Sequence, residues 1–206
     1  MSVRKNSDYF LPSVVILAAG ESKRMGKPKG LLLYKGTFFI QHQIKSLKEI
    51  GFKNIVVVLG RDYSRYVELV PKLKNEIIVR NLQTEKGQFF SIQCGLKKVR
   101  EFSGDGVFIL PIDVSCPNKE TWNKILENVN GVSAVIPSYK GKRGHPVFLS
   151  PKLIEHILSC TSDHRLDYEL KKLEKKNKVR IIDVNDRKVT LNLNTLEEWK
   201  KYVNEK

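Results

Sequence analysis

A glycine-rich and cation-rich segment offers the clearest chemistry in this sequence. The eleven residues GESKRMGKPKG (20–30) contain three glycines, four lysine or arginine side chains and a single acid, and they directly follow the apolar run SVVILAA (13–19). Glycines let backbone N–H groups approach a phosphate closely, and the cations neutralise the charge of a triphosphate or of a departing pyrophosphate. The segment therefore predicts an anion-binding loop.

The same loop excludes two common nucleotide-binding motifs. Five residues separate Gly20 from Gly26, where a Walker P-loop has four, and Lys27 is followed by proline instead of serine or threonine. The loop also lacks the GxGxxG spacing of dinucleotide-binding enzymes. We therefore expect neither an ordinary phosphate-cleaving NTPase nor a dinucleotide-dependent enzyme.

The second candidate group is the carboxylate of Asp113, which follows the apolar run GVFILPI (106–112). At the end of a strand, a carboxylate reaches a ligand without being buried unpaired. Mg²⁺ prefers hard oxygen ligands and takes one or two carboxylates, which leaves positions for water and phosphate oxygens. Asp113 is therefore predicted to bind Mg²⁺, and its alternative role is to cap the next helix.

Two more segments carry groups suited to a nucleotide and a phosphorylated acceptor. Gly87, Gln88 and Ser91 lie near the start of a predicted helix, where free backbone N–H groups favour negative or polar ligands. Arg143 and His145 lie together between two predicted strands. A guanidinium matches phosphate oxygens in pairs, so we expect Arg143 to bind an acceptor phosphate. Gln88 is also expected to contact this acceptor. His145 is expected either to contact the acceptor or to be held by backbone hydrogen bonds.

These groups must be positioned by alternating strands and helices. Short runs rich in β-branched residues predict strands at 13–19, 54–59, 76–79, 106–112, 133–137, 146–149 and 179–184. Segments of helical period lie between them, which predicts an α/β fold, a Rossmann-like three-layer α/β/α sandwich with a mainly parallel sheet. Ligands of such sheets bind beyond the carboxyl ends of the strands, where the candidate residues lie.

Two helices have specific boundary signals. A crossover helix is predicted between Thr37, as its N-terminal cap, and Gly51 at its C-terminus. Thr195 and Glu198 have the spacing of a capping box, which predicts a terminal helix. We find no repeat, low-complexity tract or linker, so a single domain over 1–206 is expected.

Composition limits the partners. The formal charge of +15 suits polyanions, but no RNA-recognition, zinc-finger or helix-turn-helix pattern accompanies it, so we expect no nucleic-acid partner. No apolar run approaches the roughly 18–20 residues of a membrane span, and no secretory signal begins the chain, so a cytoplasmic protein without a membrane partner is expected. Cys94, Cys116 and Cys160 lack CxxC spacing, which predicts buried free thiols.

The motifs resemble one known family. LAAGESKRMGKPKGLL (17–32) is similar to the signature LAAG-x-S-x-RMG-x-PK-x-LL of the molybdenum cofactor cytidylyltransferase group within the GT-A-like nucleotidyltransferases. GQFFSIQCGL (87–96), PID (111–113), GKRGHPVFL (141–149) and NLNTLEEW (192–199) follow in the family's order, so the resemblance covers nearly the whole chain. It implies a Mg²⁺-dependent enzyme that moves CMP from CTP to the phosphate of molybdopterin and releases pyrophosphate.

The resemblance also implies roles for individual residues. Arg24, Lys29 and Asp113 would form the catalytic set. The family places a second pair of metal-binding acids where this chain has Asn192 and Asn194, and either amide oxygen could bind the metal without adding charge. The implied nucleotide-binding residues are Leu17, Ala18, Ala19, Gly20, Ser22, Asn81, Gly87 and Ser91.

Other features of the resemblance concern substrates and partners. Guanylyl-transferring relatives usually read LAGG, so Ala19 favours CTP over GTP. His164 and Arg165 fall where the family often carries an arginine. A molybdoenzyme or its chaperone is the expected protein partner.

Three alternatives remain open. A sugar- or alditol-phosphate nucleotidyltransferase would share the loop and the fold. A catalytically impaired nucleotide-binding protein is indicated by Asn192 and Asn194, and a nucleic-acid-binding protein is indicated by the basic charge alone.

Overall fold

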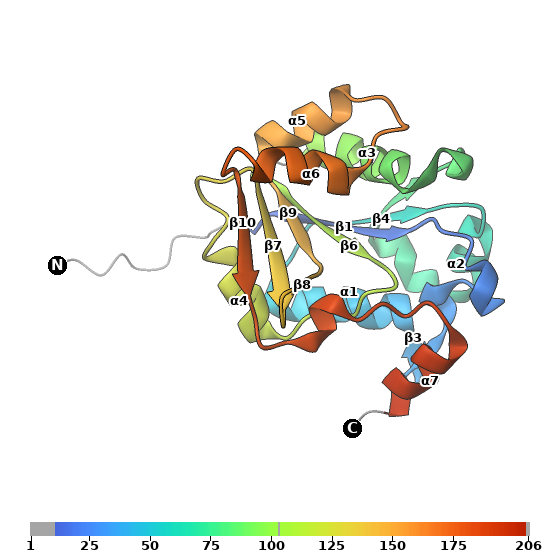
Figure 1. The fold of residues 1–206 in the computed structure, drawn as a ribbon. Helices are drawn as coiled ribbons and strands as arrows, with labels where there is room; N and C mark the ends of the chain where they lie inside the picture. Colours follow the sequence, from blue (N-terminus) through green and yellow to red (C-terminus); the bar gives the residue numbers. More distant parts are fainter. Residues whose placement is uncertain (1–10, 103, 205–206) are drawn as a thin grey trace.

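The computed structural model describes residues 11–102 and 104–204, within which eight strands form one central sheet (Figure 1). The strands are β1 Ser13–Ala18, β4 Ile55–Leu59, β5 Ile77–Arg80, β6 Val107–Pro111, β7 Ala134–Tyr139, β8 Lys142–Arg143, β9 Val147–Leu149 and β10 Val179–Asp183. Seven of them lie in the order β10-β7-β9-β6-β1-β4-β5, and β8 pairs with β7. The sheet therefore has β1 and β6 side by side near its centre.

Most neighbouring strands run in parallel. β1 pairs in parallel with β4 and β6, β4 with β5, and β10 with β7. β9 is antiparallel to β6 and β7, and β8 is antiparallel to β7. The predicted mainly parallel sheet is confirmed, and all seven predicted strands occur within two residues of their predicted ends.

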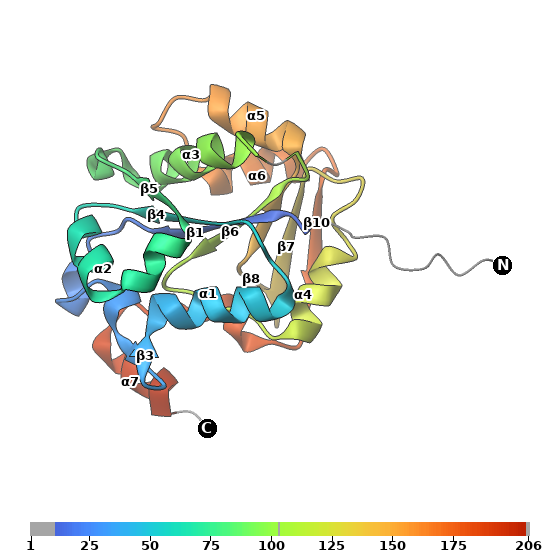
Figure 2. The same cartoon turned by 180° about the vertical axis from the view of Figure 1, so that it is seen from behind.

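Helices cover both faces of the sheet (Figures 1 and 2). One face carries α3 (Gly87–Arg100), α5 (Pro151–Ser159) and α6 (Leu166–Glu174), and the other carries α1 (Phe39–Ile50), α2 (Tyr63–Leu69) and α4 (Lys119–Leu126). This arrangement confirms the predicted α/β/α layers. No helix within the described residues is long and apolar enough to cross a membrane.

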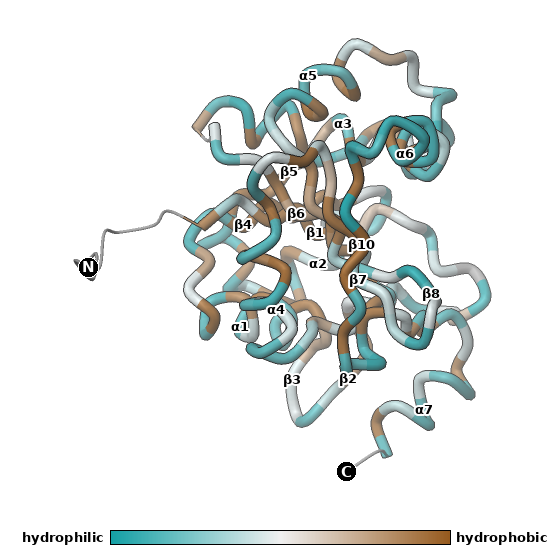
Figure 3. Tube along the Cα trace, turned by 60° about the vertical axis from the view of Figure 1, so that its left-hand side comes forward, coloured by the Kyte–Doolittle hydropathy of each residue, from teal (hydrophilic) through white to brown (hydrophobic). Residues whose placement is uncertain are grey.

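Two apolar cores separate the helix layers from the sheet. Successive side chains of a strand point to opposite faces, so Ala18 packs in the core beneath α1, whereas Leu17 and Ala19 pack in the core beneath α3. The strands in the middle of the sheet are largely hydrophobic, as Figure 3 shows. Burial on both faces explains why the sequence of these strands is almost continuously apolar.

The predicted cap of α1 is wrong, although the helix itself is confirmed. Thr37 pairs with Tyr34 in a small sheet of two short strands, β2 (Leu33–Tyr34) and β3 (Thr37–Phe38). Phe38 caps the helix, and its backbone N–H donates to Gln41 Oε1 at 3.2 Å. Strands of two residues are too short to show alternation in the sequence, which is why β2, β3 and β8 were not predicted.

The C-terminal helix α7 (Leu196–Asn204) begins at the predicted capping box. Thr195 Oγ1 accepts from the Glu198 N–H at 3.2 Å, and Glu198 Oε2 accepts from the Thr195 N–H at 2.9 Å. The helix then places the Tyr202 hydroxyl 2.6 Å from Ser115 Oγ, in the segment after β6. The chain terminus thus supports the loop that carries Asp113.

A buried glutamine holds the same loop from the other side. Gln43 of α1 is fully buried; its Oε1 accepts from the Cys116 N–H at 2.9 Å, and its Nε2 donates to the Val114 carbonyl at 2.6 Å. Buried backbone groups need partners, because an unsatisfied group loses its hydration without compensation. Gln43 therefore fixes the backbone path immediately after Asp113.

Replacing Gln43 by leucine should lower the free energy of unfolding by about 2–4 kcal/mol, because two buried backbone groups lose their partners. Urea denaturation followed by tryptophan fluorescence measures the change. Gln83→Leu is the matched control, since the Gln83 side chain is exposed, and it should change stability by less than about 0.5 kcal/mol. Equal stability of the two variants would contradict the assigned role.

Candidate functional site

A polar cavity of about 380 Å³ lies at the carboxyl ends of β1 and β6, where ligand binding is predicted. We call it the first cavity. Met25, Thr84, Pro111 and Ile112 form part of its wall. The rest of the wall consists of residues singled out in the sequence: Leu17, Ala19, Gly20, Ser22, Arg24, Lys29, Gly87, Gln88, Ser91, Asp113 and Asn194.

The ammonium group of Lys29 joins three segments in the first cavity. Its Nζ lies 2.9 Å from Asp113 Oδ2 and donates to Asn194 Oδ1 at 2.7 Å. The Lys29 and Asp113 side chains are 13% and 29% exposed. Partial burial weakens solvent screening, so this pair interacts more strongly than an ion pair on the open surface.

The glycine-rich loop is shaped by its own backbone. The Lys29 N–H donates to Ser22 Oγ at 3.3 Å, and the Met25 N–H donates to the Ser22 carbonyl at 2.8 Å. Gly26 has φ of +63°, in the left-handed region that favours glycine. This turn leaves Arg24 exposed at the cavity while the Lys29 side chain is directed inward to Asp113.

Asn81 lies behind the first cavity. It is 2% exposed; its Nδ2 donates to Ser91 Oγ at 2.9 Å, and its Oδ1 accepts from the Gln83 N–H at 2.8 Å. Ser91 Oγ in turn donates to the Gly87 carbonyl at 3.4 Å. Asn81 therefore positions Ser91, which lines the cavity, and does not line it itself.

Thr84 is a lining residue that the sequence analysis missed. It belongs to a short 3₁₀ turn, Thr84–Lys86, directly before α3. Its Oγ1 is buried and has no hydrogen-bond partner within the described part of the chain. No motif in its segment pointed to it.

A second cavity of about 740 Å³ adjoins the first, and Gly87 and Gln88 line both. The predicted acceptor residues Arg143 and His145 also line this second cavity. Another wall of the second cavity is the connection between α5 and α6. This connection contains His164 and Arg165, the two residues that fall where the resembled family often carries an arginine. The wall residues that the sequence analysis missed there are Ser162, Asp163, Leu166, Asp167, Leu170 and Lys171.

Two arginines of the second cavity are held by acids. Arg143 Nη2 lies 2.6 Å from Glu174 Oε1, and Arg165 makes two hydrogen bonds to Asp167 at 2.9 and 3.0 Å. Exposed ion pairs of this kind contribute little to stability in water. Each guanidinium can therefore exchange its acid for a phosphate at small cost.

His145 is both held by the backbone and placed at the second cavity. The backbone N–H of His145 donates to the Val189 carbonyl at 2.7 Å. The ring atom Nδ1 is buried without a hydrogen-bond partner among the described residues. Burial lowers the pKa of His145 below its ordinary value. A hydrogen bond to the Ile109 backbone and the negative charge of Asp113 raise the pKa, but burial has the larger effect. The imidazole is therefore neutral near pH 7.

Besides Asn81, two predicted site residues line neither cavity. Ala18 is 4% exposed because the alternation along β1 turns it into the opposite core. The Asn192 side chain is exposed, and its backbone forms an antiparallel bridge with Val114. Of the two asparagines, the structure brings Asn194 to Lys29 and Asp113.

Comparison with protein families gives this geometry a context. Residues 14–179 match the model of the MobA-like NTP transferase domain. The chain belongs to this family. Its membership confirms, at the level of the family, the nucleotidyltransferase resemblance indicated by the glycine-rich loop.

Curated relatives of this MobA-like domain are named probable molybdenum cofactor guanylyltransferases. The protein from Aquifex aeolicus (strain VF5) is 28% identical over 203 residues, which cover 96% of this chain and 93% of the relative. The protein from Bacillus cereus (strain B4264) is 28% identical over 132 residues, 63% of this chain and 62% of the relative. The match thus spans less than two thirds of the Bacillus protein.

Solved structures share the fold. Rv0371c from Mycobacterium tuberculosis H37Rv superposes with a TM-score of 0.79 at 22% identity, covering 94% of this chain and 97% of that chain. A nucleotidyl transferase from Methanothermobacter gives a TM-score of 0.75 at 21% identity, covering 93% and 95%. The chain therefore shares its fold with these structures over nearly its whole length.

The oxygen atoms beside Lys29 fit a magnesium ion. The carboxylate of Asp113 and the amide oxygen of Asn194 converge on one cationic group at 2.9 and 2.7 Å. Both are hard oxygen donors of the kind that Mg²⁺ selects. The set supplies a single negative charge, because Asn194 stands where the resembled family has an acid.

The burial of His145 predicts that its ring titrates below the ordinary pKa of about 6.5. The unfolded chain then binds this proton at higher pH than the folded chain, so the free energy of unfolding should fall as the pH drops below about 6.5. NMR titration of the histidine rings measures the pKa, and His145→Gln assigns the signal and should flatten this part of the stability profile. A His145 pKa at or above 6.5 would contradict the assignment.

Proposed function

We propose that the chain transfers a nucleoside monophosphate from an NTP to a small phosphorylated acceptor and releases pyrophosphate. The observation that carries this proposal is the pair of adjoining cavities, which share Gly87 and Gln88. One cavity has the cationic glycine-rich loop and Asp113, and the other has Arg143. Two ligands bound on either side of a shared wall present their reacting groups to each other, which removes much of the entropic barrier.

In the proposed reaction the chain positions phosphates and neutralises their charge. An acceptor phosphate oxygen bonds to the α-phosphorus of the NTP while the bond from that phosphorus to the bridging oxygen of pyrophosphate breaks. The acceptor is a phosphate monoester, which is already anionic near neutral pH, so a general base is not required. Lys29 and Arg24 neutralise the charge that develops on the leaving pyrophosphate.

Asp113 and Asn194 are the residues that would hold Mg²⁺, which neutralises phosphate charge and orients phosphate oxygens when bound. Lys29 would then exchange its contact with Asp113 for a phosphate oxygen. This exchange keeps the ammonium group paired throughout, so its partial burial does not leave an isolated charge.

We propose molybdopterin as the acceptor. Two observations support this choice. The curated relatives are named probable molybdenum cofactor guanylyltransferases, and the wall of the second cavity combines apolar side chains with Arg143, Arg165 and Lys171. A flat heterocycle with one phosphate matches such a mixed surface. A sugar or alditol phosphate is the alternative acceptor.

For the nucleotide we propose CTP, with GTP as the second candidate. Ala19 lines the first cavity and is 7% exposed, so its methyl group takes space that a glycine would leave to a larger base. A difference of one small group gives about 1–3 kcal/mol of discrimination. GTP is favoured by the names of the relatives from Bacillus cereus and Aquifex aeolicus.

Lys29→Ala and Arg24→Ala should each lower kcat/KM by about 100-fold or more, because each removes a cation that stabilises phosphate charge. Pyrophosphate release measures turnover, and urea denaturation checks that each variant folds. Lys27→Ala is the control, since this exposed lysine of the same loop lines neither cavity, and it should retain activity. Full activity of both site variants would remove the loop from the reaction.

Asp113→Asn should abolish the magnesium response of turnover, because the site loses its single carboxylate. Asn194→Asp should shift the response to lower Mg²⁺ concentration, since a second charge strengthens binding of a hard cation. Titration of turnover with Mg²⁺ measures both effects. An unchanged rate and magnesium response in Asp113→Asn would place the metal elsewhere.

The substrate assignment is tested by offering CTP, GTP, ATP and UTP with molybdopterin and, separately, with sugar and alditol phosphates. We expect pyrophosphate and a coupled pterin dinucleotide with CTP, and Ala19→Gly should raise the GTP-to-CTP ratio of kcat/KM by about 10-fold. Faster wild-type turnover with GTP rejects the choice of base. Coupling to a sugar phosphate alone rejects the acceptor, and ligand-induced thermal stabilisation without any turnover supports an impaired nucleotide-binding protein.

A further inference from the structure

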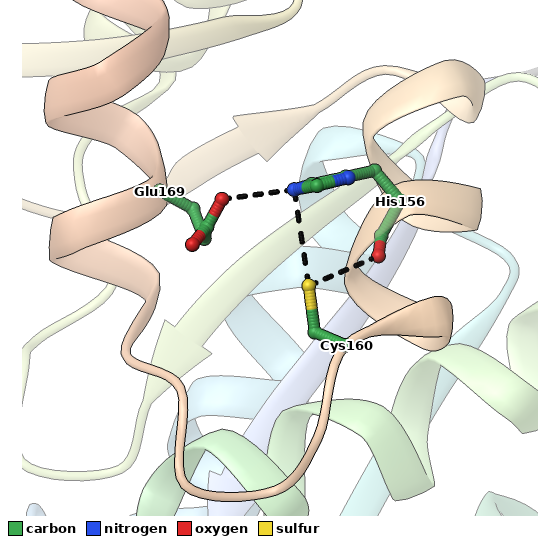
Figure 4. Close-up of side chains that lie close together, drawn as sticks. All are labelled: His156, Cys160 and Glu169. Carbon is green, nitrogen blue, oxygen red and sulfur yellow. Dashed lines mark hydrogen bonds and ion pairs between the residues drawn. The ribbon is translucent and has the colours of Figure 1, made fainter.

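Within residues 11–102 and 104–204, His156, Cys160 and Glu169 are the one group of three potential metal ligands whose donor atoms lie within 4.8 Å of one another (Figure 4). His156 lies on α5, Cys160 follows the end of that helix, and Glu169 lies on α6. His156 Nε2 is 2.8 Å from Glu169 Oε2 and 3.8 Å from Cys160 Sγ. The three side chains point toward one another from α5, from the residue after it and from α6.

This cluster is separate from the nucleotide and acceptor cavities, because none of its three residues lines either one. Cys160 follows α5 directly, and its Sγ lies 3.3 Å from the His156 carbonyl oxygen and 3.8 Å from His156 Nε2. Cys160 is half-buried, unlike the buried thiol predicted from the sequence, and the His156 side chain is 52% exposed. Solvent ions therefore have access to the imidazole and the thiol.

Glu169 supplies a fixed charge at the base of the cluster. Its side chain is 3% exposed and accepts hydrogen bonds from His156, His164 and Lys172 at 2.8, 3.1 and 3.0 Å. Three donors thus surround this buried carboxylate and replace the hydration that it loses.

The two oxygens of Glu169 have different partners. Oε1 accepts from His164 and Lys172, and Oε2 accepts from His156. A cation that binds Oε2 thus leaves the partners of Oε1 in place. Lys172 continues to offset part of the carboxylate charge, and His164 keeps its position in the wall of the second cavity.

We propose that His156 Nε2, Cys160 Sγ and Glu169 Oε2 form a binding site for Zn²⁺. Sulfur and imidazole ligands select zinc among the abundant divalent ions, whereas Mg²⁺ and Ca²⁺ require oxygen ligands throughout. Three protein ligands leave the fourth tetrahedral position to water. Coordination releases the thiol proton of Cys160 to solvent, because the thiolate is the form that binds metal. His156 binds as the neutral ring with its proton on Nδ1, so the hydrogen bond from Nε2 to Glu169 is replaced by the bonds of both atoms to the metal.

The ion would connect α5 to α6 across the segment 160–165. Ser162, Asp163, His164 and Arg165 of this segment line the second cavity. Zinc at the base of the segment therefore fixes one wall of that cavity without touching its contents. This role does not depend on the proposed transferase activity.

The test is a zinc titration of the full chain in competition with a chromophoric chelator. One Zn²⁺ should bind per chain, and Cys160→Ser and His156→Gln should each weaken binding by more than about 100-fold. Cys94→Ser, which removes the other half-buried thiol, and Asp113→Asn, which removes the carboxylate of the first cavity, should bind zinc as the wild type does. Absent binding, or equal binding in all five proteins, overturns the proposal.

Cobalt gives an independent readout of the ligands. Co²⁺ bound at this site should show sulfur-to-cobalt charge-transfer absorption in the wild type and in Cys94→Ser, and none in Cys160→Ser. Zn²⁺ should also raise the Tm of the first two proteins and leave that of Cys160→Ser unchanged, since a ligand bound to the folded state stabilises it. Co²⁺ binding without the sulfur band in the wild type overturns the assignment of Cys160.

Discussion

A partly buried ammonium group needs fixed partners, because the loss of hydration around a charge is costly unless hydrogen bonds replace it. Lys29 obtains them from Asp113, after β6, and from Asn194, near the C-terminus. These contacts bring together parts of the chain that are 84 and 165 residues apart in sequence. Gln43 and Tyr202 hold the segment after β6 in the position that this junction requires.

The positions of the two cavities follow from the order of the strands in the sheet. β1 and β6 are neighbours in parallel, so the loops after both strands meet at one edge of the sheet, and the start of α3 lies beside them. Gly87 and Gln88 consequently belong to both walls. The antiparallel strand β9 extends the sheet beyond β6, and the residues preceding it, Gly144 and His145, enter the second cavity. Two ligand sites side by side are therefore a consequence of strand order.

Local patterns in the sequence predicted most of this architecture, since buried parallel strands are short apolar runs and the charged loop directly follows one of them. Long-range packing was not visible in the same way. The sequence left Asn192 and Asn194 equivalent, and the bridge between Asn192 and Val114 distinguishes them. Thr84 and the wall after α5 were missed because packing between distant segments, and not local spacing, brings them to the cavities. The sequence analysis did not single out Glu169, because its burial depends on the packing of α6 against other parts of the fold.

The most direct test of the central claim is a crystal structure of the chain with Mg²⁺ and a non-hydrolysable NTP. The account predicts the triphosphate along the loop of residues 20–30, Asp113 among the ligands of the metal, and the Lys29 ammonium on a phosphate oxygen. A nucleotide bound outside the first cavity, with the contact between Lys29 and Asp113 unchanged, would contradict it.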